Sequence, residues 1–213
     1  MAHALIIGAT GGIGGALATA LAPNYELTLT GRDAQALGRL RRTLGAARAV
    51  AVDVTSELEL AALRGDLPSV DLLVYAVGVA RPEPLEGASD DAWSEQWRVN
   101  AQGFALTLKH LTPALAAGAR VVAIGAQPQL AAARQMAGYA ASKAALDAIA
   151  RVAALELRRA RVSVQVVRPG AVATELWAPL GGAPKAALAS DAVGERIAAW
   201  LAAGEKGDLA IDA

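Results

Sequence analysis

The sequence predicts a single α/β domain over residues 1–213, with a doubly wound parallel sheet of about seven strands flanked by helices. Two observations support this fold. Short apolar runs alternate with longer amphipathic segments along the whole chain, which is typical of strand–helix–strand units with right-handed crossovers. The strongest apolar runs are continuous, which is typical of strands that are covered on both faces. In such a sheet, ligands bind beyond the carboxyl ends of the strands.

The predicted elements follow one another in a regular order. The strands are the apolar runs Ala4–Ile7, Glu26–Thr30, Ala49–Val52, Leu72–Ala76, Arg120–Ile124, Val162–Val167 and Leu209–Ile211. The amphipathic segments between them predict helices over Gly12–Leu21, Asp33–Leu44, Ser56–Leu63, Asp90–Leu115, Gly138–Arg159 and Asp191–Ala203. Asp33 and either Ser89 or Asp90 are candidate N-caps, and Ser56 with Glu59 has the spacing of a capping box.

The composition excludes several classes of protein. The chain is 54% hydrophobic and 19% charged, and its 20 basic and 20 acidic side chains cancel. We therefore expect neither disorder nor nucleic-acid binding, which needs concentrated positive charge. No stretch reaches the ~18 uninterrupted apolar residues of a membrane span, so we expect no membrane association. The chain has no cysteine and only two distant histidines, His3 and His110, so we expect no metal site; the composition is compatible with the cytoplasm, where we expect the protein to act.

A glycine-rich turn lies between the first predicted strand and the first predicted helix. Its spacing, G-x-x-x-G-x-G, is a variant of the dinucleotide-binding pattern. Glycines permit a close approach of the backbone to a pyrophosphate, and the helix N-terminus offers free N–H groups and partial positive charge. An ordinary strand–helix turn is the alternative, but the position after an N-terminal strand favours nucleotide binding. We expect a Rossmann-like cofactor site that includes Gly8, Thr10, Gly12, Ile13 and Gly14.

The ends of the second and third strands indicate which dinucleotide would bind. The second strand runs into Arg32, with no acidic residue where one would bind both ribose hydroxyls. A guanidinium suits a 2′-phosphate, which favours NADP over NAD, although Arg32 could also be a solvated residue before a helix. Asp53, which precedes Val54, could accept a hydrogen bond from the adenine amino group or could instead serve as a turn acceptor for the next helix.

Tyr139 and Lys143 are spaced so that they share one face of a predicted helix. A phenol with its ordinary pKa of ~10 is a poor acid–base catalyst at neutral pH, and a nearby ammonium would lower that pKa. The chain holds only three tyrosines and four lysines, so this pair is the strongest candidate for the chemical centre. The structural alternative is a half-buried tyrosine beside a lysine whose stem lies along the apolar surface.

Together, these features resemble the short-chain dehydrogenase/reductase family along nearly the whole chain. The resemblance implies that Tyr139 is the catalytic acid–base, while Lys143 binds the nicotinamide ribose and lowers the tyrosine pKa. It also implies that Asn100 supports a water-mediated proton relay. The remaining matches are the turn that would pack against nicotinamide and the threonine that would contact its carboxamide, namely Pro169, Gly170 and Thr174.

The sequence departs from the family pattern at Ala126, at Tyr75 and at Ile7, which replaces a common threonine before the first glycine of the motif. Family members usually carry a catalytic serine thirteen residues before the tyrosine, and Ala126 stands there. Losing such a hydrogen-bond donor commonly costs ~10²–10³ in rate. Gln127 or Gln129 could supply an amide donor instead, if the loop shifted. The second departure is Tyr75, which replaces the first asparagine of a usual Asn-Asn-Ala-Gly turn and is expected to affect packing rather than chemistry.

We therefore expect an NADP-dependent oxidoreductase that moves a hydride between the nicotinamide and a small or apolar carbonyl or alcohol substrate, although NAD is possible. Trp177, Leu130 and Met136 are candidates for the substrate walls. The alternative, favoured by Ala126, is a dinucleotide-binding protein with little or no turnover that acts as a sensor or binding partner. The resemblance and the alanine-rich helices also imply a homodimer or homotetramer.

Overall fold

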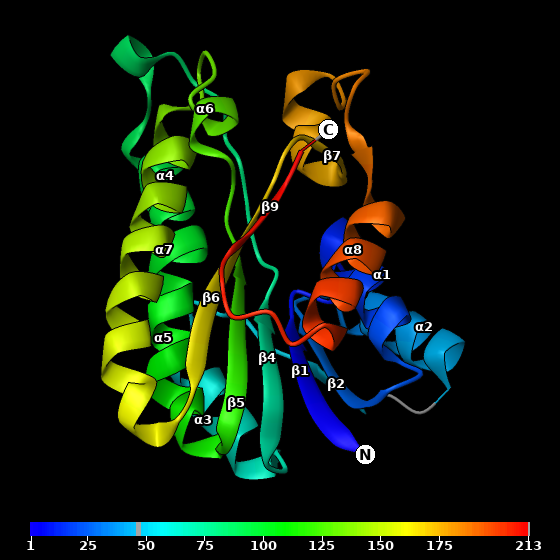
Figure 1. Ribbon diagram of the computed structural model, residues 1–213. Coiled ribbons are helices and arrows are strands. Elements are labelled where there is room, and N and C mark those ends of the chain that lie inside the picture. The colour runs from blue at the N-terminus through cyan, green and yellow to red at the C-terminus, as the bar shows by residue number, and fades with distance from the viewer. Residues whose placement is uncertain (46–47, 213) are drawn as a thin grey trace.

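The computed structural model describes residues 1–45 and 48–212, and its doubly wound α/β fold confirms the sequence prediction (Figure 1). The described part contains a parallel sheet of seven strands in the order β3-β2-β1-β4-β5-β6-β9. These strands are β1 (Ala2–Ile7), β2 (Tyr25–Gly31), β3 (Arg48–Ala51), β4 (Val70–Tyr75), β5 (Leu115–Ile124), β6 (Ser163–Pro169) and β9 (Leu209–Ile211). The strand order reverses between β1 and β4, the position at which ligands bind in such sheets.

Helices cover both faces of the sheet. Successive residues of a strand point to opposite faces, so each central strand contributes to two apolar cores. Ala4 and Ile6 of β1 join one apolar core, whereas Leu5 and Ile7 join the other. One helical layer contains α1 (Gly12–Leu21), α2 (Ala34–Leu44) and α8 (Ser190–Ala202) (Figure 1). The opposite layer contains α3 (Glu57–Asp66), α4 (Asp90–Gln96), α5 (Gly103–Leu111) and α7 (Ala137–Glu156). Across residues 1–45 and 48–212, none of the helices is long and apolar enough to span a membrane.

Polar side chains begin three of the helices. Asp33 caps α2 by accepting hydrogen bonds from the next turn, and Ser89, rather than Asp90, caps α4. Ser56 accepts a hydrogen bond from the backbone N–H of Glu59, as a capping box requires. The Glu59 carboxylate does not close the box; it accepts from the backbone N–H of Asp53 at 2.7 Å, and so ties α3 to the end of β3.

The region after β4 differs most from the prediction. The helix expected over Asp90–Leu115 ends at Leu111 and passes into a 3-10 turn over Thr112–Ala114, because Pro113 has no N–H to donate to the carbonyl four residues back. The same helix is interrupted by π-helical turns over Trp97–Gln102, and β5 begins at Leu115, earlier than expected. The small elements that the sequence did not indicate include α6 (Pro128–Ala131), a two-stranded sheet of β7 (Val172–Ala173) and β8 (Leu188–Ala189), and several short 3-10 helices.

Candidate active site

The glycine-rich turn after β1 is built for close backbone contacts. Gly8 has φ +88°, and a Cβ atom there would lie 2.9 Å from the carbonyl carbon of Ala76. A Cβ atom on Gly14 would collide with the carbonyl oxygen of Gly8. The backbone N–H groups of Gly8 and Ala9 both donate to the carbonyl of Thr30, at 3.0 and 2.8 Å. The turn is therefore held against β2 and β4, and only glycine fits at its two tightest points.

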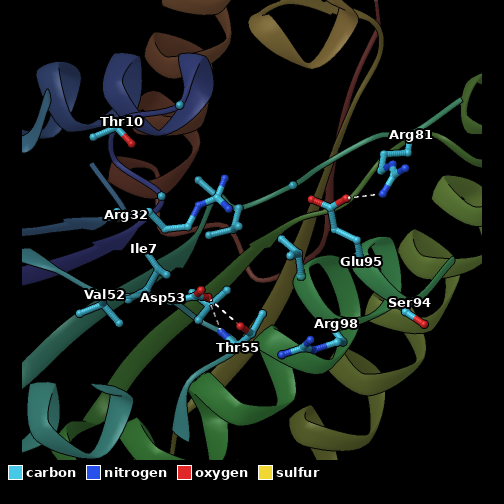
Figure 2. A pocket seen from close by; sticks show the side chains of 18 of the residues that line it. Ile7, Thr10, Arg32, Val52, Asp53, Thr55, Arg81, Ser94, Glu95 and Arg98 are labelled. Carbon is cyan, nitrogen blue, oxygen red and sulfur yellow. Dashed lines mark hydrogen bonds and ion pairs between the residues drawn. The ribbon is translucent and has the colours of Figure 1, made fainter. Parts of the chain in front are cut away.

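A cavity of about 610 Å³ lies beside this turn, at the carboxyl ends of β1, β2, β3 and β4. Figure 2 shows the Arg32 side chain reaching into it between Thr10 and Asp53. An ion pair between Arg81 and Glu95, at 3.2 Å, lies across the cavity. Five of the predicted cofactor residues line this cavity: Gly8, Thr10, Arg32, Asp53 and Val54.

Asp53 has the turn role that the sequence left open. One of its carboxylate oxygens accepts from the backbone N–H and the hydroxyl of Thr55, at 2.8 and 2.9 Å. In the described part of the chain, Asp53 and Arg32 form no hydrogen bond with each other, and the Arg32 side chain is exposed. The guanidinium is therefore accessible to a ligand, and no acidic partner neutralises it among the described hydrogen bonds and ion pairs.

A second cavity, of about 210 Å³, continues from the first along the edge of the sheet, and the two share Gly11 and Gly78 as walls. Residues that are widely separated in the sequence meet there: Gly12, Ile13, Ala126, Tyr139, Lys143, Pro169, Gly170, Thr174, Leu176 and Trp177. The glycine turn and the Thr174 loop approach closely, since a Cβ atom on Gly12 would lie 2.5 Å from Cγ2 of Thr174. The fold thus joins the two predicted halves of the site in one continuous groove.

Tyr139 and Lys143 are both buried in the wall of this second cavity. Burial lowers the pKa of the Lys143 ammonium to about 8, although the Asp147 carboxylate opposes that shift. Burial also raises the pKa of the Tyr139 phenol to about 12. The direction for the tyrosine is opposite to the expected one. Lys143 Nζ donates to the carbonyl of Ile124 at 2.9 Å and lies 5.9 Å from the centre of the Tyr139 ring.

Asn100 lies behind the groove, fully buried, in the π-helical turns between α4 and α5. Its side-chain oxygen accepts from the backbone N–H of Val79 at 2.8 Å, and its Nδ2 donates to the Val79 carbonyl at 2.9 Å. The same Nδ2 donates to the Ser142 hydroxyl at 2.9 Å. The side chain therefore fastens the loop after β4 to the helix that carries Tyr139.

The loop after β5 offers no evident replacement for the missing serine. Ala126 lines the second cavity and packs against the apolar cluster around Tyr139. Gln127 points away, since its Nε2 donates to the Ile211 carbonyl at 3.1 Å and to the Asp212 carboxylate at 2.7 Å. Gln129 is exposed on α6, and neither glutamine lines the cavity.

The predicted substrate walls are only partly present. Trp177 lines the second cavity, and its indole N–H donates to the carbonyl of Val172 at 2.8 Å. Met136 lies in the buried cluster behind the cavity, and Leu130 is exposed outside it. Leu176 is a wall residue that the sequence reasoning missed. Its neighbour Trp177 was recognisable as a bulky residue in a short loop, whereas nothing local distinguished Leu176.

Comparisons with known proteins decide the family. The sequence profile of the short chain dehydrogenase family matches residues 2–184, which is most of the chain. The chain belongs to the short-chain dehydrogenase family. Among curated relatives, D-threitol dehydrogenase of Mycolicibacterium smegmatis is 31% identical over 81% of this chain and 71% of that protein. The cis-4-hydroxycyclohexanecarboxylate dehydrogenase of Sinomonas cyclohexanicum is 31% identical over 88% of this chain and 80% of the length of that protein.

Solved structures agree with that membership. A short-chain oxidoreductase of Thermus thermophilus is 42% identical, with a TM-score of 0.87 over 93% of this chain and 95% of that one. A short-chain dehydrogenase of Sphingobium yanoikuyae, solved in complex with NADPH, has a TM-score of 0.84 at 23% identity, over 100% of this chain and 87% of its own. The latter likeness shows that the two proteins share a fold. As a short-chain dehydrogenase, this protein belongs to a family of oxidoreductases.

Proposed function

We propose that this short-chain dehydrogenase is an NADP-dependent oxidoreductase that interconverts a small, apolar carbonyl compound and its alcohol. The observation that carries the proposal is the continuous groove, with the exposed Arg32 at one end and the Tyr139–Lys143 pair at the other. Structures of the same fold hold NADPH in the Sphingobium yanoikuyae protein and NADP in one from Burkholderia cenocepacia. A relative from Listeria innocua is named as NAD-dependent, so the choice of cofactor rests on Arg32.

The glycine turn fits a dinucleotide. A side chain at Gly8 would collide with the backbone of Ala76, so glycine lets the turn lie tight against the end of β4, and α1 begins directly after the turn with free backbone N–H groups. Arg32 would hold the 2′-phosphate, and Lys143 would hold the nicotinamide ribose. Thr174 and the Pro169–Gly170 turn line the cavity where the nicotinamide would lie. When bound, the nicotinamide supplies or accepts the hydride.

Tyr139 is the proposed proton donor in carbonyl reduction. Burial keeps its phenol protonated at neutral pH, so it begins the reductive reaction as an acid. The Lys143 ammonium lies on the same helical face and would stabilise the phenolate that forms after proton transfer. Ala126 donates no hydrogen bond, so Tyr139 alone would polarise the carbonyl. We therefore expect a rate ~10²–10³ below that of a site with a second donor.

The size and lining of the second cavity support a small substrate. The cavity has a volume of about 210 Å³ and also has to receive the nicotinamide. The walls beside Tyr139 that are free of cofactor residues are mostly apolar, with Ala126, Leu176 and the ring of Trp177, although the exposed Glu175 also lines the cavity. A compact aldehyde or ketone with little polar surface meets both conditions.

A binding protein with little turnover is the second candidate, and Ala126 is the observation that favours it. The test follows NADPH oxidation across a panel of small aldehydes and ketones with wild type, Tyr139→Phe and the control Tyr25→Phe. We expect turnover by wild type and Tyr25→Phe and at least a hundredfold loss in Tyr139→Phe. NADPH binding without turnover, restored by Ala126→Ser, would instead support the binding protein.

The same preparations test the cofactor. We expect Arg32→Ala to weaken NADPH binding at least tenfold by fluorescence titration, while NADH binding changes less than twofold. Arg39→Ala, which removes an exposed arginine one turn into α2, should leave both affinities unchanged. A wild type that prefers NADH would contradict the role of Arg32.

A further inference from the structure

The helix that carries Asn100 contains a backbone defect. Over Trp97–Gln102 it is π-helical, and the Gly103 N–H donates to the carbonyl of Arg98, five residues back. In a regular α-helix that N–H would bond the carbonyl of Val99, four residues back, so the defect deprives this carbonyl of its usual donor. A buried carbonyl left without a donor is costly, and the fold supplies one from a different element.

That donor is Tyr75, at the end of β4. Its hydroxyl donates to the Val99 carbonyl at 2.5 Å, and the residue is fully buried. Its ring packs against Phe104, with ring centres 5.3 Å apart, and burial holds the pKa of the phenol well above its usual range. The hydroxyl therefore stays protonated and remains a donor at any pH at which the protein is folded and active.

Gly103 makes the room for this hydroxyl. A Cβ atom on Gly103 would lie 2.6 Å from Oη of Tyr75 and 2.9 Å from Cγ2 of Val54. Gly103 is in ordinary helical conformation, so no unusual backbone angle explains a glycine there. Tyr75 and Gly103 are thus complementary: the hydroxyl occupies space that exists only because the helix carries no side chain at that position.

The bond from Tyr75 lies next to Asn100, a polar side chain that connects the helix to Tyr139 through Ser142. Asn100 follows Val99 directly and binds both backbone groups of Val79 and the Ser142 hydroxyl. Ser142 in turn donates to the backbone carbonyl of Tyr139 at 2.8 Å. A chain of hydrogen bonds and one peptide unit therefore leads from Tyr75 to the backbone of the proposed acid.

We propose that Tyr75, seated on Gly103, is a positioning residue that fixes the π-helical turns and thereby holds the Asn100 side chain beside Tyr139. Tyr75 does not line the cavity that holds Tyr139 and Lys143, so its proposed effect on them passes through Asn100. The effect of Tyr75 on turnover rests on the proposed function. The effect of Tyr75 on the Asn100 side chain is independent of the proposed function, and the two effects are measured separately.

The first measurement needs no activity. The chain has only two asparagines, the buried Asn100 and the exposed Asn24, so selective ¹⁵N-asparagine labelling gives one probe and one internal reference. We expect Tyr75→Phe, which keeps the ring, to speed hydrogen exchange of the Asn100 side-chain amide at least tenfold and to leave Asn24 unchanged. Thr112→Val is the matched control, because it deletes another hydroxyl-to-carbonyl bond near the end of the same helix. Unchanged exchange at Asn100 in Tyr75→Phe would overturn the proposal.

A second variant keeps the test decisive if Tyr75→Phe folds poorly. Gly103→Ala drives a methyl group toward the Tyr75 hydroxyl and should also speed exchange at Asn100; unchanged exchange in this single variant would contradict the proposal. In the Tyr75→Phe/Gly103→Ala double variant, Gly103→Ala should speed exchange less than it does in wild type, because the Tyr75 hydroxyl with which the methyl group collides is absent. Equal effects of Gly103→Ala in both backgrounds would show that the two residues are not coupled and would contradict the proposal.

The kinetic measurement addresses catalysis. In Tyr75→Phe we expect kcat to fall about tenfold, with KM and the NADPH dissociation constant within twofold and a larger solvent deuterium isotope effect on kcat. Faster exchange at Asn100 with unchanged kcat would overturn the catalytic part. Faster exchange in the variant, together with a wild type that shows no turnover, would support the positioning of Asn100 and refute the proposed function.

Discussion

At the scale of the residue, the amine of Lys143 is a buried ionisable group. It lies in the wall of the second cavity, the Ile124 carbonyl accepts its hydrogen bond, and the Asp147 carboxylate supplies an opposing charge. An ammonium loses hydration on burial, which is why its pKa falls to about 8. The site therefore keeps a cation at a cost in folding free energy, and that cost depends on pH.

The sign of this dependence can be tested. Below pH 8, Lys143 is charged in both folded and unfolded states, so the full cost is present. Between about pH 8 and 10.5, the folded protein releases the proton while the unfolded chain keeps it, so stability rises with pH. In urea denaturation, wild type should gain about 2 kcal/mol relative to Lys143→Met between pH 7.5 and 10. The exposed-lysine control, Lys185→Met, should follow wild type; identical slopes for wild type and Lys143→Met would refute this prediction.

At the scale of the element, the position of α1 depends on α8. A Cβ atom on Gly194 of α8 would lie 2.7 Å from a backbone carbon of Ala16 in α1, so the two helices touch through their main chains. Figure 1 shows them on the same side of the sheet. Because α1 begins at the glycine turn, this contact also holds the helix N-terminus toward which a pyrophosphate would bind.

We expect Gly194→Ala to lower the free energy of unfolding by about 1–3 kcal/mol, because an extra methyl group has to push two backbones apart. Gly65→Ala is the matched control in α3, where an added Cβ atom meets nothing within 4 Å. It should raise stability by about 0.5–1 kcal/mol, since alanine is the better helix former. Thermal and urea unfolding measure both changes. A neutral Gly194→Ala would show that the helices adjust without cost.

At the scale of the whole molecule, the outer face of α5 and α7 carries apolar side chains that the described chain leaves uncovered. A cavity of about 600 Å³ lies between these helices, lined by Leu108, Ile149 and Val152 among others. Val152 is 53% exposed and Leu155, farther along α7, is 73% exposed. Because apolar patches of this kind mark association surfaces, we propose that a second copy of the chain covers this face.

Light scattering at micromolar concentration should therefore give a dimer or tetramer for the wild type. Val152→Glu places a charge in the proposed contact and should shift the protein toward monomer. Leu58→Glu is the control, because Leu58 is 81% exposed on α3 and lies outside the cavity. It should leave the assembly unchanged. A monomeric wild type would refute the proposed association.

Much of the fold and site followed from local patterns. Apolar periodicity predicted the strand–helix order and the parallel sheet, and the glycine turn and the Tyr139–Lys143 spacing predicted residues that the structure brings into one groove. These features could be predicted because periodicity, turn-forming glycines and helical spacing are properties of residues close in the chain. The predicted helix end at Leu115 is four residues beyond the observed end of α5, although Pro113 is a local signal for the earlier end.

The tertiary structure decided the features that depend on residues distant in sequence. The pKa of Tyr139 rises rather than falls because enclosure by the whole fold outweighs one nearby amine. Gln127 cannot replace the missing serine, because its amide is held by Ile211 at the end of β9 and by Asp212 after it. The π-helical turns around Asn100 depend on a hydroxyl that β4 supplies. Burial, electrostatics and hydrogen bonds between elements arise only when separate segments pack together, and so the sequence by itself determined the framework while packing determined the chemistry of its side chains.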